Sequence, residues 1–203
     1  MAKNHSVEGS LRSAAVWNGG MAAVQLVVAV ATGNVGYFNE AGHNTADSIS
    51  YEAKSRAAVH ENASKSLRLR KVACAVMALG AGYSFYGGVS NILEHEKEQT
   101  SPALIALALG GAIVNAGISK RVHGAGGEHE NESGHGHAHD HSHGAHQDGK
   151  LHTVADAVTG MLYSTGLAAE TTHPGAANYV ILLNGFITGG HALAIANNIN
   201  KAE

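Results

Sequence analysis

Long uncharged runs of apolar, Gly and Ala residues alternate along the chain with short polar segments. Four runs contain no Asp, Glu, Lys or Arg, and these are residues 14–32, 72–93, 102–119 and 176–198. A helix needs about 20 such residues to cross a bilayer. Two further runs, 35–51 and 151–169, are more polar than these four and complete the series. The pattern predicts an all-α polytopic membrane protein, a bundle of six transmembrane helices that forms one domain over residues 1–203.

Lys and Arg are sorted along the chain in a way that the competing interpretation, a soluble helical protein, does not explain. With six spans, both tails and the connections after the second and fourth spans share one side and hold 12 of the 13 basic residues. Only Lys97, between the third and fourth spans, lies on the other side. Such an excess of Lys and Arg is typical of cytoplasmic loops. We therefore predict a multi-pass protein of the cell membrane with both termini in the cytoplasm.

Charge and cysteine content exclude other classes of protein. The formal net charge of -3 gives no basic surplus for binding nucleic acid. Cys74 is the single cysteine, so neither an intrachain disulfide nor a CxxC metal site can form. The chain has no G-x-S-x-G nucleophile elbow and no HExxH motif. We therefore do not expect an enzyme, and a metal-dependent membrane hydrolase would need a general base and a substrate pocket in addition.

The two polar spans carry the same motif, His-x-x-x-Asp. His43 and Asp47 form it in the second span, and His152 and Asp156 form it in the fifth. Residues four apart lie on one face of a helix. A charged side chain at the middle of a membrane helix costs about 2.5 to 3.5 kcal/mol, so two such helices need a compensating interaction. Two imidazoles and two carboxylates are suitable ligands for tetrahedral Zn²⁺, so the motifs predict a metal or proton site.

Other polar residues within the spans are weaker candidates. Glu40 shares a helix face with His43 and Asp47, and it is either a fifth, accessory ligand on the entrance side or an interfacial residue. His191 and Asn184 lie within the sixth span, where hydrogen bonding between helices explains them more simply than transport does.

A histidine-rich segment separates the fourth and fifth spans at residues 123–150. It contains the sequence GHGHAHDHSHGAH and has no apolar face to bury, so we expect disorder in the absence of metal. The expected low-affinity metal ligands are His135, His137, His139, His141, His143 and His146. The segment is either a device that gathers metal ions or an inert linker.

The whole layout resembles the cation diffusion facilitator family of zinc transporters. The resemblance covers about residues 11–198 and rests on six spans, the two His-x-x-x-Asp motifs and the histidine-rich loop. Its strongest segments are GNVGYFNEAGHNTADS at 33–48 and LHTVADAVTG at 151–160. Members usually continue into a cytoplasmic metal-binding domain, whereas this chain ends at Glu203. We therefore expect a short form, in which any homodimer forms through the membrane helices or the loops.

The resemblance implies a function for the paired motifs. His43, Asp47, His152 and Asp156 match the transport-site ligands of the zinc-preferring members. The family exports metal from the cytoplasm in exchange for protons, so Zn²⁺ is expected as the substrate and no resident cofactor is needed. Cd²⁺, Co²⁺ and Ni²⁺ are alternative substrates. The alternative function is a non-transporting, membrane-anchored metal buffer that uses the histidine-rich loop.

Overall fold

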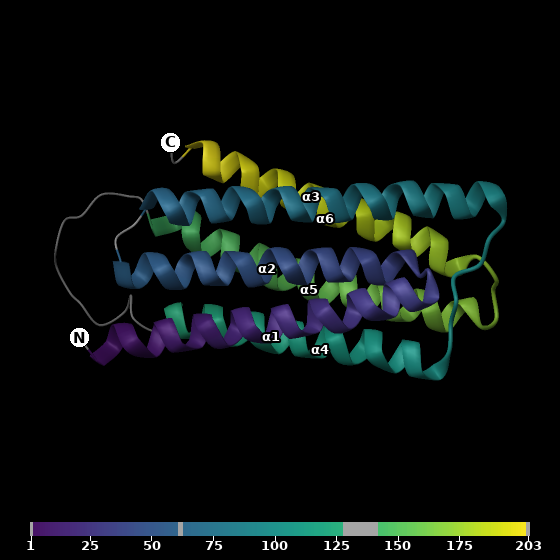
Figure 1. Ribbon diagram of the computed structural model, residues 1–203, viewed down its shortest axis with the longest axis horizontal. Helices are drawn as coiled ribbons and strands as arrows, with labels where there is room; N and C mark the ends of the chain where they lie inside the picture. The colour runs from purple at the N-terminus through teal and green to yellow at the C-terminus, as the bar shows by residue number, and fades with distance from the viewer. Residues whose placement is uncertain (1, 61–62, 128–141, 202–203) are drawn as a thin grey trace.

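The computed structural model describes residues 2–60, 63–127 and 142–201, and within them the side chains of residues 8–56, 64–122, 154 and 157–200. The described residues form six α-helices and no strand. In chain order these are α1 (Ala2–Thr32), α2 (Val35–His60), α3 (Ala63–Glu94), α4 (Pro102–Gly127), α5 (Ser142–Glu170) and α6 (Ala176–Lys201). They lie lengthwise beside one another, with both chain termini at one end of the bundle (Figure 1). We call this the terminal end and the opposite one the distal end.

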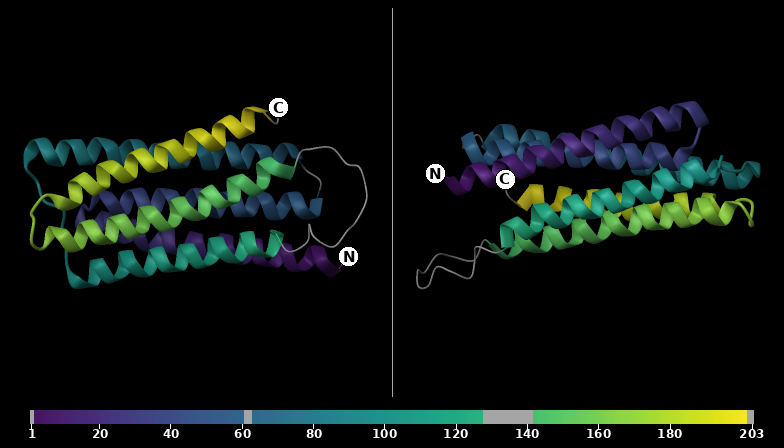
Figure 2. Two further views of the ribbon diagram at one scale, coloured as in Figure 1. Left: turned by 180° about the vertical axis from the view of Figure 1, so that it is seen from behind. Right: turned by 90° about the horizontal axis from the view of Figure 1, so that it is seen from below.

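The helices are arranged in two layers of three. One layer holds α1, α2 and α3, the other holds α4, α5 and α6, and α2 and α5 are the central helices (Figures 1 and 2). Around the bundle, contacts follow the order α1, α2, α3, α6, α5 and α4. The ring closes between α4 and α1, which are the neighbours in least extensive contact. Residues on the inward faces of α2 and α5 therefore point toward the space between the layers.

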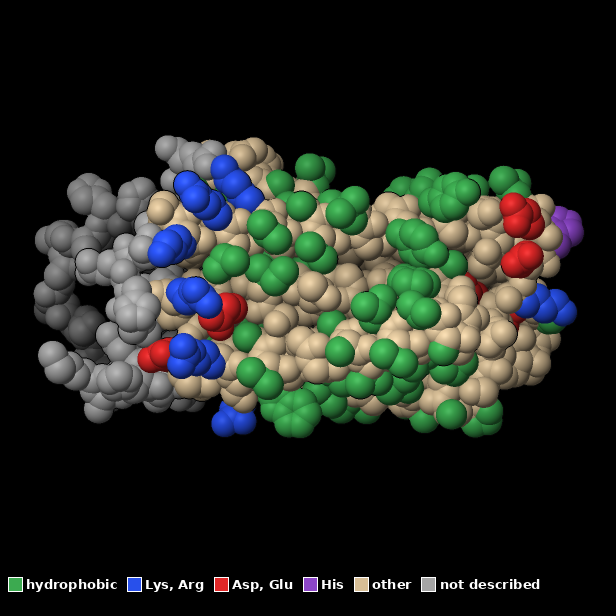
Figure 3. Space-filling view, viewed as in Figure 1, with side chains coloured by type: hydrophobic (Ala, Val, Ile, Leu, Met, Phe, Trp, Pro, Cys, Tyr) green, Lys and Arg blue, Asp and Glu red, His purple; other side chains and the backbone are tan. Residues whose placement is uncertain are grey.

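The surface of the bundle is apolar along much of its length. Val16, Leu79 and Leu193 have exposed fractions of 74%, 74% and 71%. Figure 3 shows apolar side chains over the middle of the visible face, while Lys and Arg gather at the terminal end. Four helices, α1, α3, α4 and α6, are long and apolar enough to cross a membrane. Such a surface is typical of a membrane protein, in agreement with the class predicted from the sequence.

The helices extend beyond the predicted spans at the terminal end. α2 continues to His60 and α3 begins at Ala63, so both take in residues predicted as loop. Likewise α4 reaches Gly127 and α5 begins at Ser142, so the two ends of the segment predicted as a disordered loop are helical. Hydropathy marks only the apolar part of a helix, whereas the helical backbone hydrogen bonds continue into polar sequence. The middle of that segment, residues 128–141, lies outside the described residues.

Local sequence sets the helix boundaries at the distal end. Gly33 has a φ of 69°, a left-handed conformation that ends α1 without strain. Asn34 then caps α2, because its Oδ1 accepts a hydrogen bond from the Tyr37 N–H at 3.1 Å. Ser101 caps α4 in the same way, with its Oγ 3.2 Å from the Leu104 nitrogen. The short connections at this end are thus fixed by side chains that bind free N–H groups.

Glycine allows α2 and α6 to approach α3 closely. A Cβ atom on Gly42 of α2 would lie 3.3 Å from the Cα of Gly80. On the other side of α3, a Cβ on Gly185 of α6 would lie 3.1 Å from the Ala81 carbonyl oxygen, and one on Gly189 would lie 3.7 Å from the Ala81 Cβ. Small residues allow this proximity between membrane helices. As a result, α2 and α6 are both held against α3, and their polar residues come within reach of each other.

Candidate functional site

The His-x-x-x-Asp motif of α2 forms a buried pair inside the bundle. His43 Nε2 lies 3.5 Å from Asp47 Oδ2, one helical turn away. The two residues have exposed fractions of 3% and 2%. Glu40 has an exposed fraction of 7% and lies one turn closer to the distal end of the same helix. Imidazole and carboxylate groups shielded from solvent can hold a divalent cation or exchange protons.

α6 brings a second histidine to this pair. His191 is 6% exposed, and its ring centroid lies 5.9 Å from that of His43 with the rings tilted by 45°. The sequence suggested only interhelical hydrogen bonding for this residue. That expectation is confirmed for its neighbour in the same helix, Asn184, whose Nδ2 donates to the Thr159 carbonyl of α5 at 3.0 Å. His191 also lies beside the candidate site.

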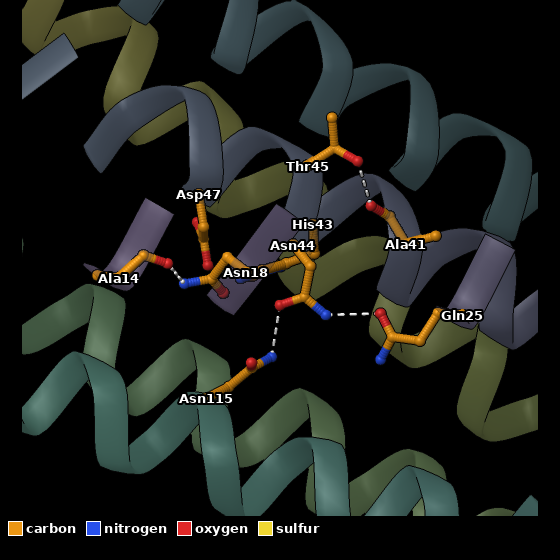
Figure 4. A network of polar contacts seen from close by, with 9 residues as sticks. All are labelled: Ala14, Asn18, Gln25, Ala41, His43, Asn44, Thr45, Asp47 and Asn115. Carbon is orange, nitrogen blue, oxygen red and sulfur yellow. Dashed lines mark hydrogen bonds and ion pairs between the residues drawn. The ribbon is translucent and has the colours of Figure 1, made fainter. Parts of the chain in front are cut away.

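Three amide side chains connect the site to two further helices. Asn115 of α4 donates from Nδ2 to Asn44 Oδ1 at 2.7 Å, and Asn44 donates from Nδ2 to Gln25 Oε1 of α1 at 2.6 Å. Asn44 directly follows His43, and the whole network is buried (Figure 4). The bonds join α4, α2 and α1 across the two layers. This network fixes the rotation of α2 and thereby the direction in which His43 and Asp47 point.

Sequence reasoning missed these amides. Gln25 and Asn115 each lie within an uncharged, mostly apolar run, and Asn44 stands between the two members of the His-x-x-x-Asp motif. An amide within a mostly apolar span is the available signal, because a buried polar group there requires a partner. The partner itself could not be read from spacing, because it lies on another helix.

The second half of the predicted site lies on α5. His152 and Asp156 belong to this helix, but their side chains lie outside the described residues. The same holds for His143 and His146 near the start of α5, and the predicted loop ligands His135, His137, His139 and His141 fall within residues 128–141, also outside the description. Among the described side chains, no group of three or more His, Cys, Asp or Glu residues is arranged to hold a metal ion.

Aromatic side chains fill the space between α2 and α5 on the distal side of the site. The rings of Tyr37 and Tyr163 meet edge to face, with centroids 5.3 Å apart and planes at 88°. The Tyr163 hydroxyl donates to Asn34 Oδ1, and the Tyr37 hydroxyl donates to the Leu104 carbonyl. A Cβ on Gly36 would lie only 2.0 Å from the Tyr163 ring, so glycine is required there. The Tyr163 ring therefore joins the two central helices at the distal end.

Two buried carboxylates reinforce the distal end. Glu98, in the connection between α3 and α4, accepts hydrogen bonds at 3.2 Å from the Val35 N–H and from Asn91 Nδ2. Glu170 accepts from the backbone N–H of Gly175 at 2.7 Å and of Ala177 at 2.9 Å, at the start of α6. Burial, aided by the nearby charge of Glu170, raises the pKa of Glu98 to about 7. Glu98 can therefore exchange a proton near neutral pH.

No model of a known protein family matches the chain, and no significantly similar chain was found among curated proteins or solved structures.

Proposed function

We propose that this protein is a divalent metal transporter, with Zn²⁺ as its main substrate, that exchanges metal for protons. The proposal is carried by the buried His43–Asp47 pair, which lies on the central helix of a bundle with an apolar exterior. Ionisable residues inside membrane helices are costly to bury and commonly mark an ion or proton pathway. The motif repeated on α5 and the resemblance to the cation diffusion facilitator family support the same function.

All six helices cross the membrane in this proposal, with the terminal end in the cytoplasm. The 26 residues of α2 and the 29 residues of α5 give lengths of about 39 and 44 Å, enough for a hydrocarbon core of about 30 Å. Lys and Arg gather at the terminal end, as expected for a cytoplasmic face (Figure 3). Hydropathy alone does not mark α2 and α5 as spans, because their sequences contain more polar and charged residues than those of the other four helices.

The transport site combines His43 and Asp47 of α2 with His152 and Asp156 of α5. Asp47 is 12 residues, about 18 Å, from the distal end of α2. Asp156 is 14 residues, about 21 Å, from the distal end of α5. The two residues therefore occupy positions of similar depth along the two central helices, which supports a shared ion. Glu40 is then an accessory ligand on the distal side.

Metal and proton binding are coupled through the chemistry of the ligands. Imidazole binds metal only when neutral and carboxylate only when ionised, so an arriving metal ion displaces protons and arriving protons displace metal. The contact between Tyr37 and Tyr163 lies on the distal side of the site, between α2 and α5. The resemblance to the cation diffusion facilitator family implies that metal arrives from the cytoplasm. Alternating access then requires α2 and α5 to separate at the distal end. The histidine-rich connection joins helix ends on the cytoplasmic side, where it raises the local metal concentration.

The test is zinc-driven proton flux in proteoliposomes under an imposed pH gradient. Asp47→Asn and Asp156→Asn should each lower the flux about tenfold or more. Glu52→Gln is the matched control, because Glu52 lies on the same helix but pairs with Arg56 at 2.7 Å, with half-exposed side chains. Normal flux in either site variant would refute the site. Zinc binding without flux, unaffected by both substitutions, would instead identify a metal buffer.

The histidine-rich segment requires its own variant. Deleting residues 134–146 should raise the metal concentration needed for half-maximal flux and leave the maximal rate unchanged, because selectivity belongs to the helix site. Complete loss of flux would contradict a gathering role.

A further inference from the structure

A groove separates α1 and α4 near the terminal end of the bundle. It encloses about 320 Å³ and is lined by Ser10, Ser13 and Trp17 of α1 and by Gly117, Ile118 and Arg121 of α4, among others. It exists because small residues stand where the two helices would otherwise touch. A Cβ atom on Gly117 would meet no other atom within 4 Å, which shows open space beside α4. The groove is distinct from the candidate transport site.

The floor of the groove is apolar and its rim is positive. Ile118 and Val122 pack against a buried cluster that includes Leu11 and Tyr51. Among the described residues that line the groove, Arg121 alone is charged, and its side chain is exposed at the rim. Trp17 is 61% exposed, as is common for indole rings at the interface between lipid and water. The groove therefore offers an apolar channel that ends at a cation and two hydroxyl groups.

We propose that this groove binds one anionic phospholipid, with the phosphate paired to Arg121 and an acyl chain lying along Trp17 and Ile118. Both α1 and α4 belong to the helices that can cross a membrane, so bilayer lipid surrounds the groove. Basic pockets between membrane helices on the cytoplasmic side recognise anionic head groups. The exposed Ser13 hydroxyl adds a hydrogen-bond donor for phosphate oxygens. The proposal depends on membrane insertion and is independent of metal transport.

Native mass spectrometry of the full-length protein in detergent tests this proposal. Dioleoylphosphatidylglycerol should bind more tightly than dioleoylphosphatidylcholine. Arg121→Gln should reduce this preference about fivefold, the effect of one cation near an anionic head group. Lys120→Gln is the matched control, because it removes the adjacent exposed charge, which does not line the groove. Gly117→Leu should weaken the binding of both lipids by filling the groove.

Three results would overturn the proposal. An undiminished preference in the Arg121→Gln variant would exclude this head-group contact. Equal effects of Arg121→Gln and Lys120→Gln would indicate diffuse attraction to a positive surface. Full displacement of phosphatidylglycerol by millimolar inorganic phosphate would show that the acyl chain contributes nothing.

Discussion

Replacing Glu98 by Gln should remove a pH dependence of stability that this carboxyl imposes on the protein. Its pKa is about 7 in the folded protein, against an ordinary value of 4.5. The folded protein thus holds the proton more tightly than the unfolded chain does. The resulting stabilisation is fully present below about pH 4.5 and is lost as the pH rises through 7.

The size of the effect follows from the difference between the two pKa values. It corresponds to about 3 kcal/mol, and Glu98 is only 5% exposed, so solvent screens little of it. The amide that replaces the carboxyl in the variant cannot ionise, yet its oxygen can still accept from the Val35 N–H and from Asn91 Nδ2. We therefore expect Glu98→Gln to be more stable than the wild type at pH 8 and similar to it near pH 4.5.

Denaturant titration of the detergent-solubilised protein between about pH 4.5 and 8 measures this difference in the free energy of unfolding. Contributions from other titrating groups cancel when the free energy of unfolding of the variant is subtracted from that of the wild type at each pH. Glu96→Gln is the control for the loss of a negative charge, because it removes an exposed carboxylate from the same connection. Parallel profiles for wild type and Glu98→Gln would refute the argument that burial governs this carboxyl.

Two further substitutions test the packing around the candidate site. Gly36→Ala introduces a methyl group that overlaps the Tyr163 ring, and it should destabilise the protein by about 1 to 3 kcal/mol in the same titration. Its control is Gly20→Ala on α1, which adds a methyl group in open space and should be neutral or stabilising. Asn44→Ala breaks two interhelical hydrogen bonds and should lower the free energy of unfolding by about 1 to 3 kcal/mol. Asn18→Ala should lower it less, because Asn18 donates to the Ala14 carbonyl of its own helix. Equal losses within either pair would contradict the contacts described.

The apolar runs of the sequence predicted the helices because membrane helices need little beyond length and composition. All four uncharged runs lie within helices that can span a membrane. The helix ends were less predictable, since α3 begins at Ala63 and α5 at Ser142, in sequence too polar for a hydropathy signal. The layered arrangement was not predictable either, because it depends on contacts such as that between Gly42 and Gly80.

The candidate site was predictable only where its residues are close in sequence. His43 and Asp47 are four residues apart on one helix, so their pairing follows from helix geometry. The proximity of His191 to His43 spans well over a hundred residues, and the bond between Asn44 and Asn115 joins different helices. Such relations arise from how the helices rotate against each other, which no local pattern in this sequence encodes.

The weak contact between α1 and α4 has a mechanical consequence for the whole bundle. The remaining neighbours in the ring are joined more extensively, and α3 is fitted to α2 and α6 through glycine. A closed ring of helices deforms first at its least extensive interface, because tightly packed interfaces resist sliding. The least costly way to widen the bundle is therefore to separate α1 from α4.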